Sequence, residues 1–263
     1  MPTPAYGQKK PWQKPKRFGE TYEACTSADK NHSYIPQKLE LKPDTSYLHI
    51  TANNTIYGTQ WQDFPDVSVP VICDMSSDIL SRPVDVKKFS LIYAGAQKNL
   101  GPAGVVIVIV KKSFLETART DLPPMLSYQN YADNDSLYNT PPVFAIYMVN
   151  KTLHWIKAQG GVNAIAARNR EKAQLIYDVI DASRGFYRGH AEKTSRSLMN
   201  ITFNLQMPEM EKDFIAEGKK RGFIGIGGHR LVGGCRVSAY NAVTPEACRA
   251  LADFMKEYQA KHE

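Results

Sequence analysis

The sequence predicts an α/β fold with a mainly parallel sheet, followed by a smaller C-terminal α+β unit. In the first part of the chain, short β-rich apolar runs are separated by turn residues, a pattern typical of strands buried on both faces. In the second part, helical patterns alternate with single strands. With 263 residues, of which 43% are hydrophobic and 22% charged, the chain can form one large globular domain or two smaller ones. We place the boundary near Gly160, which gives domains of residues 1–160 and 161–263.

The strands of the first part come first in the chain, and its helices follow with recognisable ends. Apolar runs at residues 47–51, 69–73, 91–94 and 105–110 predict the strands. Ser113 to Glu116 has the spacing of a capping box, so a helix is expected to begin there. Thr140 stands before Pro141, which would place a capping hydroxyl ahead of a long helix that ends near Gly160. The second part should then contain helices at 162–183, 208–222 and from Thr244 onward, with strands at 198–205 and 234–240.

Charge and cysteine content exclude several classes of function. The formal net charge of +7 falls to +2 without the five basic residues of the first 19. This stretch contains four prolines and has no acidic residue. A basic tail of this kind is usually solvated, so no nucleic-acid partner is expected. The longest apolar run, residues 104–110, is far short of the roughly 20 residues that span a bilayer, and no leader pattern opens the chain. The four cysteines lack C-x-x-C spacing, so we expect a cytoplasmic protein with no membrane contact, no metal site and no disulfide.

A lysine between two apolar strands is the first candidate for chemistry. Lys98 stands in a Gly/Ala-rich loop, and Asp74 ends the preceding predicted strand. On spacing alone Lys98 would be a solvated surface residue, but open α/β sheets bind ligands at the carboxyl ends of their strands, where these two groups would meet. Such a pair suits pyridoxal-phosphate chemistry, in which a lysine holds the aldehyde carbon and an aspartate keeps the pyridine nitrogen protonated. A partly desolvated lysine also has a lowered pKa, which makes it a better nucleophile and proton carrier.

Three long strings resemble the signature blocks of one family. Residues 74–83, 92–99 and 228–236 look like those of phosphoserine aminotransferase, a class V pyridoxal-phosphate enzyme, and they occur in the family's order. The resemblance covers nearly the whole chain from about Phe18. It implies the type I fold of pyridoxal-phosphate-dependent transferases, with an N-terminally incomplete large domain.

The resemblance also implies roles for residues near the cofactor. Lys98 would be the Schiff-base lysine, which also carries a proton to and from the substrate α-carbon, and Asp74 would be the partner of the pyridine nitrogen. Thr55 would lie on the side of the ring's phenolic oxygen, and Gln97 would hold the cofactor phosphate.

Two further groups of residues follow from the same resemblance. Asn139 and Thr140 would reach the cofactor phosphate of the other subunit of a homodimer, a role that suits the positive end of a helix dipole, although Thr140 can equally be a plain helix cap. His229, Arg230 and Arg236 would bind the acidic substrate, because guanidinium groups match carboxylate and phosphate oxygens. On spacing alone these three could also be solvated loop cations.

The implied reaction transfers the amino group of L-glutamate to 3-phosphohydroxypyruvate, which gives O-phospho-L-serine and 2-oxoglutarate in serine biosynthesis. Pyridoxine biosynthesis, through 4-phosphohydroxythreonine, is a related possibility that the sequence leaves open. Family members also have an N-terminal segment with a glycine-rich phosphate loop and a His–Arg pair, and this sequence has neither. Gly7 aligns with the tryptophan that stacks on the ring, whereas Trp12 falls five residues later.

Two alternatives therefore stay open. One is a catalytically impaired, shortened homologue that serves as a dimerisation or regulatory module. The other is a different class V enzyme, such as a cysteine desulfurase. A desulfurase needs a mobile reactive thiol, and Cys235 is a poor candidate because it lies within a predicted strand, where burial raises the pKa of a thiol.

Overall fold

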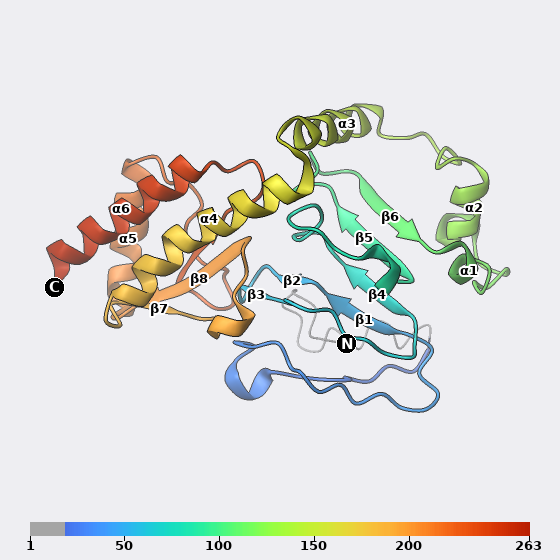
Figure 1. Ribbon diagram of the computed structural model, residues 1–263, viewed down its shortest axis with the longest axis horizontal. Helices are drawn as coiled ribbons and strands as arrows, with labels where there is room; N and C mark the ends of the chain where they lie inside the picture. The colour runs from blue at the N-terminus through green and yellow to red at the C-terminus, as the bar shows by residue number, and fades with distance from the viewer. Residues whose placement is uncertain (1–18) are drawn as a thin grey trace.

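A four-stranded sheet forms the centre of the first part of the chain. The computed structural model describes residues 19–263, so the predictions for the opening stretch, including those for Gly7 and Trp12, lie outside the described residues. The strands lie in the order β1-β4-β5-β6, of which the first three are parallel and β6 is antiparallel to β5. The carboxyl ends of β1, β4 and β5 therefore meet at one edge, as expected for an α/β sheet (Figure 1). The strand bounds are β1 Leu48–Thr51, β4 Val71–Asp74, β5 Leu91–Gly95 and β6 Val106–Val110.

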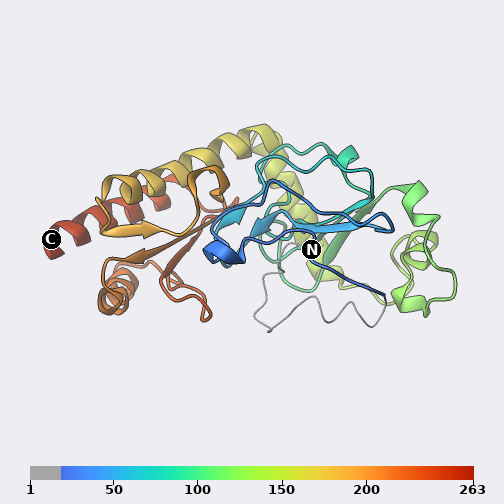
Figure 2. The same cartoon turned by 90° about the horizontal axis from the view of Figure 1, so that it is seen from below.

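The C-terminal part is built on a three-stranded antiparallel sheet in the order β7-β8-β9. Helices α4 and α6 pack on each other, and α4 also contacts β7 and β8. Figure 2 shows α4 and α6 on one side of this sheet and α5 on the other. The bounds are α4 Gly161–Ala182, β7 Tyr187–Gly189, β8 Asn200–Leu205, α5 Pro208–Lys220, β9 Cys235–Ser238 and α6 Pro245–His262.

A short hairpin connects the two parts. Strands β2 (Asn53–Asn54) and β3 (Thr59–Gln60) follow β1 and pair with each other. Thr202 Oγ1 of β8 donates a hydrogen bond to the Tyr57 carbonyl at 2.8 Å. Gly58 is required at the tip, because its φ is +72° and an added Cβ would lie 2.7 Å from the Asn200 carbonyl. The hairpin thus brings the carboxyl edge of the first sheet against β8.

Between the two sheets the chain runs through short elements and one long helix, α3. The bounds are α1 Lys112–Leu115, α2 Tyr128–Asp133 and α3 Val143–Ala158, with a 3-10 turn at Pro124–Leu126. Elsewhere in the described chain, 3-10 turns lie at Ala28–Lys30 before β1, at Val86–Lys88 between β4 and β5, and at Lys193–Ser195 between β7 and β8.

The buried hydrophobic side chains form two separate clusters. All members of one lie between Ala24 and Val149, and it is centred on β1, β4 and β5. All members of the other lie between Ala173 and Tyr258, on α4, α5, α6 and the second sheet. This separation supports our proposed division of the chain near Gly160.

Three local predictions were wrong. Helix α1 begins at Lys112 and has only four residues, so Ser113 lies inside it and does not cap it. Helix α3 begins at Val143, after Pro142, and has no side-chain cap. The reason is that a residue before a proline disfavours the α conformation, so the helix cannot start at Pro141. Strand β6 is not buried on both faces, because it is the last strand of the described sheet and leaves Val106 61% exposed.

Other predictions agree with the structure. Thr244 Oγ1 accepts a hydrogen bond from the Ala247 amide and caps α6. All four cysteines are free thiols, and three of them are buried. No helix within residues 19–263 is both long enough and apolar enough to cross a membrane.

Candidate active site

Lys98 and Asp74 lie at the carboxyl edge of the first sheet. Asp74 is the last residue of β4 and pairs with Tyr93 of β5, and Lys98 stands in the turn that directly follows β5. The two are close enough for the Asp74 carboxylate to favour the charged form of Lys98. The expectation that these two groups meet at one edge of the sheet is therefore met.

The Lys98 ammonium group is partly desolvated and has one defined partner. Its Nζ donates a hydrogen bond to Thr55 Oγ1 at 2.8 Å. Burial lowers the pKa of Lys98, the positive charge of Arg236 lowers it further, and Asp74 opposes both. A lysine with a lowered pKa has a larger neutral, nucleophilic fraction near neutral pH than a solvated lysine.

Asp74 is held by groups that the sequence analysis missed. Its Oδ1 accepts a hydrogen bond from the Ser76 amide at 2.8 Å. The Tyr93 hydroxyl also bonds to Asp74, and it lies 2.9 Å from His49 Nε2. Burial first, and then the Asp74 charge, raises the pKa of Tyr93, whereas burial lowers the pKa of His49. Asp74 is thus oriented by a neutral Tyr–His pair.

Gln97 lies next to Lys98 and is exposed. Its side chain lies over Gly95, where an added Cβ would be 2.6 Å from Gln97 Oε1. The amide therefore stands beside the turn that carries Lys98, has no hydrogen-bond partner among the described residues, and can donate to an anion placed there.

Arg236, one of the residues predicted to bind the substrate, lies beside Thr55. It lies on β9, and its Nη1 donates to the Thr55 carbonyl at 3.3 Å. Its Nε is buried without a hydrogen-bond partner among the described residues. His229 and Arg230 lie in the loop before β9, and the pKa of His229 is lowered by partial burial and then by the charges of Arg236 and Arg230. Arg236 and Arg230 thus lie close enough to His229 to favour its neutral form.

Asn139 and Thr140 are the predicted site residues that the fold does not bring to Lys98. Both are exposed in the loop between α2 and α3. Asn139 bonds to Tyr131 Oη at 3.1 Å and to the Thr140 carbonyl at 3.2 Å. Neither residue has a hydrogen bond to Thr55, Asp74, Gln97 or Lys98 in the described part of the chain.

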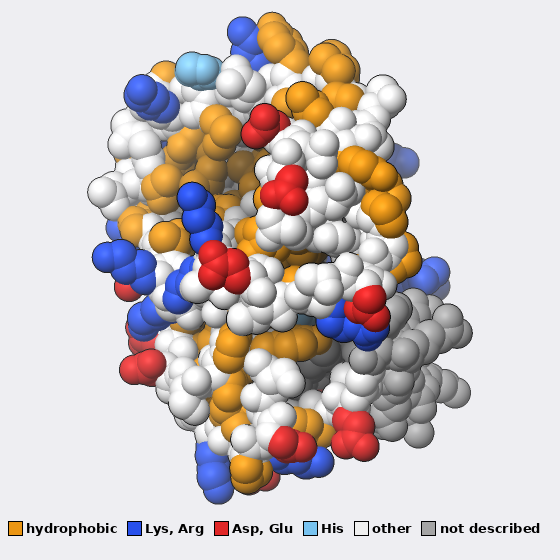
Figure 3. Space-filling view, turned by 90° about the vertical axis from the view of Figure 1, so that its right-hand side faces the viewer, with side chains coloured by type: hydrophobic (Ala, Val, Ile, Leu, Met, Phe, Trp, Pro, Cys, Tyr) orange, Lys and Arg blue, Asp and Glu red, His pale blue; other side chains and the backbone are white. Residues whose placement is uncertain are grey.

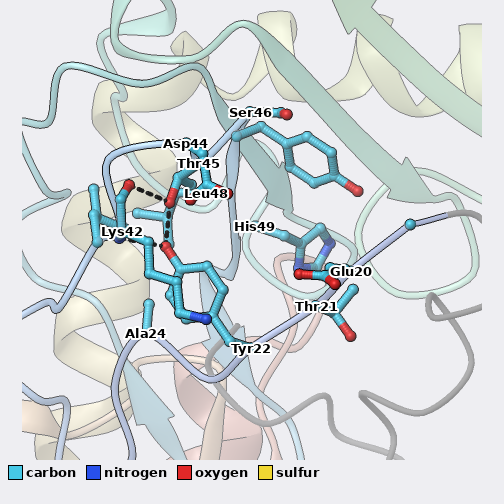
Figure 4. A pocket seen from close by; sticks show the side chains of 13 residues that line it. Glu20, Thr21, Tyr22, Ala24, Lys42, Asp44, Thr45, Ser46, Leu48 and His49 are labelled. Carbon is cyan, nitrogen blue, oxygen red and sulfur yellow. Dashed lines mark hydrogen bonds between the residues drawn. The ribbon is translucent and has the colours of Figure 1, made fainter.

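A cavity of about 890 Å³ lies beside β1 and does not include Lys98. Figure 4 shows its polar wall, where Tyr22 and Thr45 hydrogen-bond and the Lys42 amide donates to Tyr22 Oη at 2.9 Å. His49 also lines this cavity while it bonds to Tyr93. The cavity is therefore connected to the Asp74 region only through His49 and Tyr93, and Lys98, Thr55 and Arg236 do not line it.

Comparisons with known proteins agree with this geometry. The family model described as Aminotransferase class-V matches residues 6–251. The phosphoserine aminotransferase of Lysinibacillus sphaericus is 55% identical over 257 residues, which are 97% of this chain and 71% of that protein. The phosphoserine aminotransferase of Bacillus subtilis is 55% identical over 249 residues, with 94% and 69% covered. The chain thus spans about 70% of the length of these relatives.

Solved structures match at the level of the whole fold. Phosphoserine aminotransferase from Bacillus circulans subsp. alkalophilus superposes with a TM-score of 0.93 at 50% identity, over 96% of this chain and 71% of that one. A structure of pyridoxal-phosphate-bound phosphoserine aminotransferase from Trichomonas vaginalis gives a TM-score of 0.82 at 38% identity, over 86% and 65%.

Proposed function

This chain belongs to the class V aminotransferases and, within them, to the phosphoserine aminotransferases, and we propose that the residues around Lys98 carry out that transamination. The reaction moves the amino group of L-glutamate to 3-phosphohydroxypyruvate and forms O-phospho-L-serine and 2-oxoglutarate, a step of serine biosynthesis. The observation that carries the proposal is the partly desolvated Lys98 beside Asp74 at the carboxyl edge of the sheet.

The donor set around Lys98 fits pyridoxal phosphate, the cofactor of this family. Lys98 offers an amine for the aldehyde, Asp74 a carboxylate for the pyridine nitrogen, and Thr55 a hydroxyl close to the amine. Gln97 can donate to the phosphate. When bound, the protonated ring supplies a sink for the electron pair left on the substrate α-carbon.

Lys98 is the group that moves the proton. Its lowered pKa leaves Nζ able to accept a proton from the substrate α-carbon and to return it at the adjacent position. Thr55 restrains Nζ through the 2.8 Å hydrogen bond. Asp74 accepts a hydrogen bond from the Ser76 amide and lies beside the Tyr93 hydroxyl, so its carboxylate is held in place to pair with a protonated ring nitrogen.

The cations on the other side of Lys98 select an acidic substrate. Arg236 has an unpartnered Nε and a guanidinium geometry suited to a carboxylate. Arg230 adds positive charge for a phosphate group, and His229, whose lowered pKa favours the neutral imidazole, can donate a hydrogen bond to it. Glutamate and 3-phosphohydroxypyruvate are both doubly acidic, and 4-phosphohydroxythreonine of pyridoxine biosynthesis belongs to the same class, so we include it in the proposal.

We further propose a cytoplasmic, isologous homodimer in which Asn139 and Thr140 serve the neighbouring site. Their exposure away from Lys98 supports this arrangement. Figure 3 views the right-hand side of Figure 1, where hydrophobic side chains gather on the surface, as at a protein interface. Exposed apolar residues of α3 and β6 are Val106, Ile109, Val143, Phe144, Ile146, Tyr147 and Leu153.

The test is an absorbance titration of the purified 263-residue chain with pyridoxal phosphate, with Lys98→Ala as the matched control. We expect a band of lysine-bound cofactor in the unchanged chain alone, and we expect glutamate to bleach it.

Without a band, the chain would be a dimerisation or regulatory module of the same fold. Sulfide release from cysteine would indicate a desulfurase instead, which the burial of Cys235 disfavours because it raises the pKa of that thiol to about 12.

A further inference from the structure

A buried chain of hydrogen bonds runs from Lys98 into the C-terminal unit. Lys98 Nζ donates to Thr55 Oγ1 at 2.8 Å, and Thr55 Oγ1 donates to Ser77 Oγ at 3.1 Å. Asn53 Nδ2 then donates both to Ser77 Oγ at 2.9 Å and to Asn200 Oδ1 of β8 at 2.8 Å. The three residues farthest from Lys98 are almost fully buried, with exposed fractions of 3% for Ser77, 1% for Asn53 and 0% for Asn200. We call these five residues the relay.

The relay has a fixed direction because Ser77 has no spare hydrogen-bonding capacity. A serine hydroxyl offers one donor and two acceptor lone pairs. Its hydrogen goes to the Asn53 carbonyl at 2.9 Å, and its two lone pairs accept from Asn53 Nδ2 and Thr55. The Thr55 hydrogen is therefore committed to Ser77, and toward Lys98 the Thr55 oxygen can only accept.

Asn200 keeps the relay from reversing. If the Asn53 side-chain amide were flipped, Asn53 Oδ1 would face Asn200 Oδ1, and two acceptors would meet. A joint flip of both amides is disfavoured, because it would turn the Asn53 Nδ2 hydrogens into the buried position where Oδ1 has no partner among the described residues, and orphaned buried N–H groups are rarer than orphaned carbonyl oxygens. Asn53 Oδ1 is left buried without a partner among the described residues, a cost that this orientation tolerates.

We propose that Asn53 and Asn200 are positioning residues that set the proton affinity of Lys98 by holding Thr55 as a pure hydrogen-bond acceptor. The proposal rests on the proposed function only for the role of Lys98 as the working amine. According to the proposal, the C-terminal unit helps to set the proton affinity of Lys98, although Asn200 contacts neither Lys98 nor Thr55.

Two charged groups also affect the pKa of Lys98, so their effects must be distinguished from that of the relay. Asp74 favours the charged ammonium, and Arg236 disfavours it. Neither belongs to the relay, and a change at Asn200 leaves both in place. Asn200 also bonds to Tyr240 Oη, whose hydroxyl interacts with Thr55, and Ser77→Ala, which leaves that bond in place, distinguishes the relay from this second route.

The experiment compares Asn200→Leu with Asn169→Leu in the full 263-residue chain. Asn169 is a matched control, because it is also 0% exposed and bonds to the Ser81 carbonyl at 2.8 Å and to Asn241 Oδ1 at 2.9 Å, but makes no bond to the relay. The pKa of Lys98 is measured from the pH dependence of its acetylation rate, followed by mass spectrometry without added cofactor. This readout stays valid even if the chain fails to bind pyridoxal phosphate.

We expect Asn200→Leu to lower the pKa of Lys98 by roughly 0.5 to 1 unit, because Thr55 becomes free to turn its own hydrogen toward Nζ and about one hydrogen bond to the ammonium is lost. Asn169→Leu should leave the pKa of Lys98 unchanged, although it should lower the thermal midpoint of unfolding about as much as Asn200→Leu does. Asn200→Asp retains an acceptor for Asn53 and should not lower the pKa.

Equal shifts of the pKa of Lys98 in the two leucine variants, or no shift with Asn200→Leu, would overturn the proposal. If Asn200→Leu does not fold, Ser77→Ala removes a single oxygen from the middle of the relay and should produce the same downward shift. A folded Ser77→Ala protein with an unchanged pKa of Lys98 would equally refute it.

Discussion

Tyr93 is the side chain that couples Asp74 to the interior of the first sheet. Its hydroxyl bonds to Asp74 and lies 2.9 Å from His49 Nε2. Because burial and the neighbouring carboxylate both raise the pKa of Tyr93, it remains a neutral donor over the working pH range. The Tyr93 hydroxyl thus stays available to hold the Asp74 carboxylate in place.

We expect Tyr93→Phe to lower kcat/KM for glutamate by roughly tenfold, since a hydrogen bond to a charged group contributes about 1.5–3 kcal/mol and only part of it acts on the transition state. The cofactor should still bind. Tyr34→Phe is the control, because Tyr34 Oη also bonds to an aspartate, Asp29, at 2.9 Å on the surface. An equal loss in both variants would show that the effect does not pass through Asp74. The measurement is steady-state kinetics at saturating pyridoxal phosphate.

Single residues differ in how far the sequence could predict them. Lys98 and Asp74 follow strands in the sequence, and the parallel sheet brings strand ends together, so their proximity was predictable. Tyr93 and His49 lie inside strands, where an aromatic side chain is usually a packing residue. Asn200 is 147 residues from its partner Asn53. Only the three-dimensional fold brings such polar groups into contact.

At the scale of elements, helix α4 contains a lysine that is expected to make stability depend on pH. Lys172 is 0% exposed, and its Nζ donates to the carbonyls of Ala239 and Tyr240 at 3.0 and 2.8 Å. Burial lowers its pKa to about 8 from the ordinary 10.5. The penalty for burying the charge is complete below pH 8 and is relieved as the pH rises, because the unfolded state then binds more protons than the native state.

The free energy of unfolding should therefore gain a rising component between about pH 8 and 10.5, with a slope of at most about 1.4 kcal/mol per pH unit. Lys172→Met removes the titrating group, so the difference in stability between the two proteins should grow in favour of the unchanged chain as the pH rises through this window. Urea denaturation at pH 7.5, 8.5 and 9.5 measures it. A difference that is constant with pH would mean that Lys172 keeps its ordinary pKa.

Helix ends show where local patterns suffice and where they do not. Thr244 caps α6 as its pattern predicts, since a single proline follows it at the first helical position. Thr140 has the same local pattern, but a second proline follows, and α3 starts only at Val143. Pro142 excludes Pro141 from the helical conformation, so the cap pattern at Thr140 has no helix to cap.

At the scale of the whole molecule, the candidate site draws residues from both parts of the chain. Lys98, Asp74 and Thr55 stand at the edge of the first sheet, and Arg236 belongs to β9 of the second. The β2–β3 hairpin holds the two parts together through its bonds to β8. The main strands and helices of both parts could be predicted in their order along the chain, but the hairpin, with two-residue strands, was too short to be predicted from periodicity.

The exposed positions of Asn139 and Thr140 lead to a test of shared sites. If both residues serve the partner subunit's cofactor, then Lys98→Ala and a double Asn139→Ala, Thr140→Ala variant should each be nearly inactive alone. In a mixed dimer, the subunit that keeps Lys98 receives intact Asn139 and Thr140 from its partner, so one of the two sites is restored. An equal mixture contains about half mixed dimers, and activity should return to about one quarter of that of the unchanged protein. The measurement is the glutamate-dependent amination of 3-phosphohydroxypyruvate after the two variants are unfolded together and refolded. Activity that stays at the level of the separate variants would place Asn139 and Thr140 in the site of their own subunit, or outside any site.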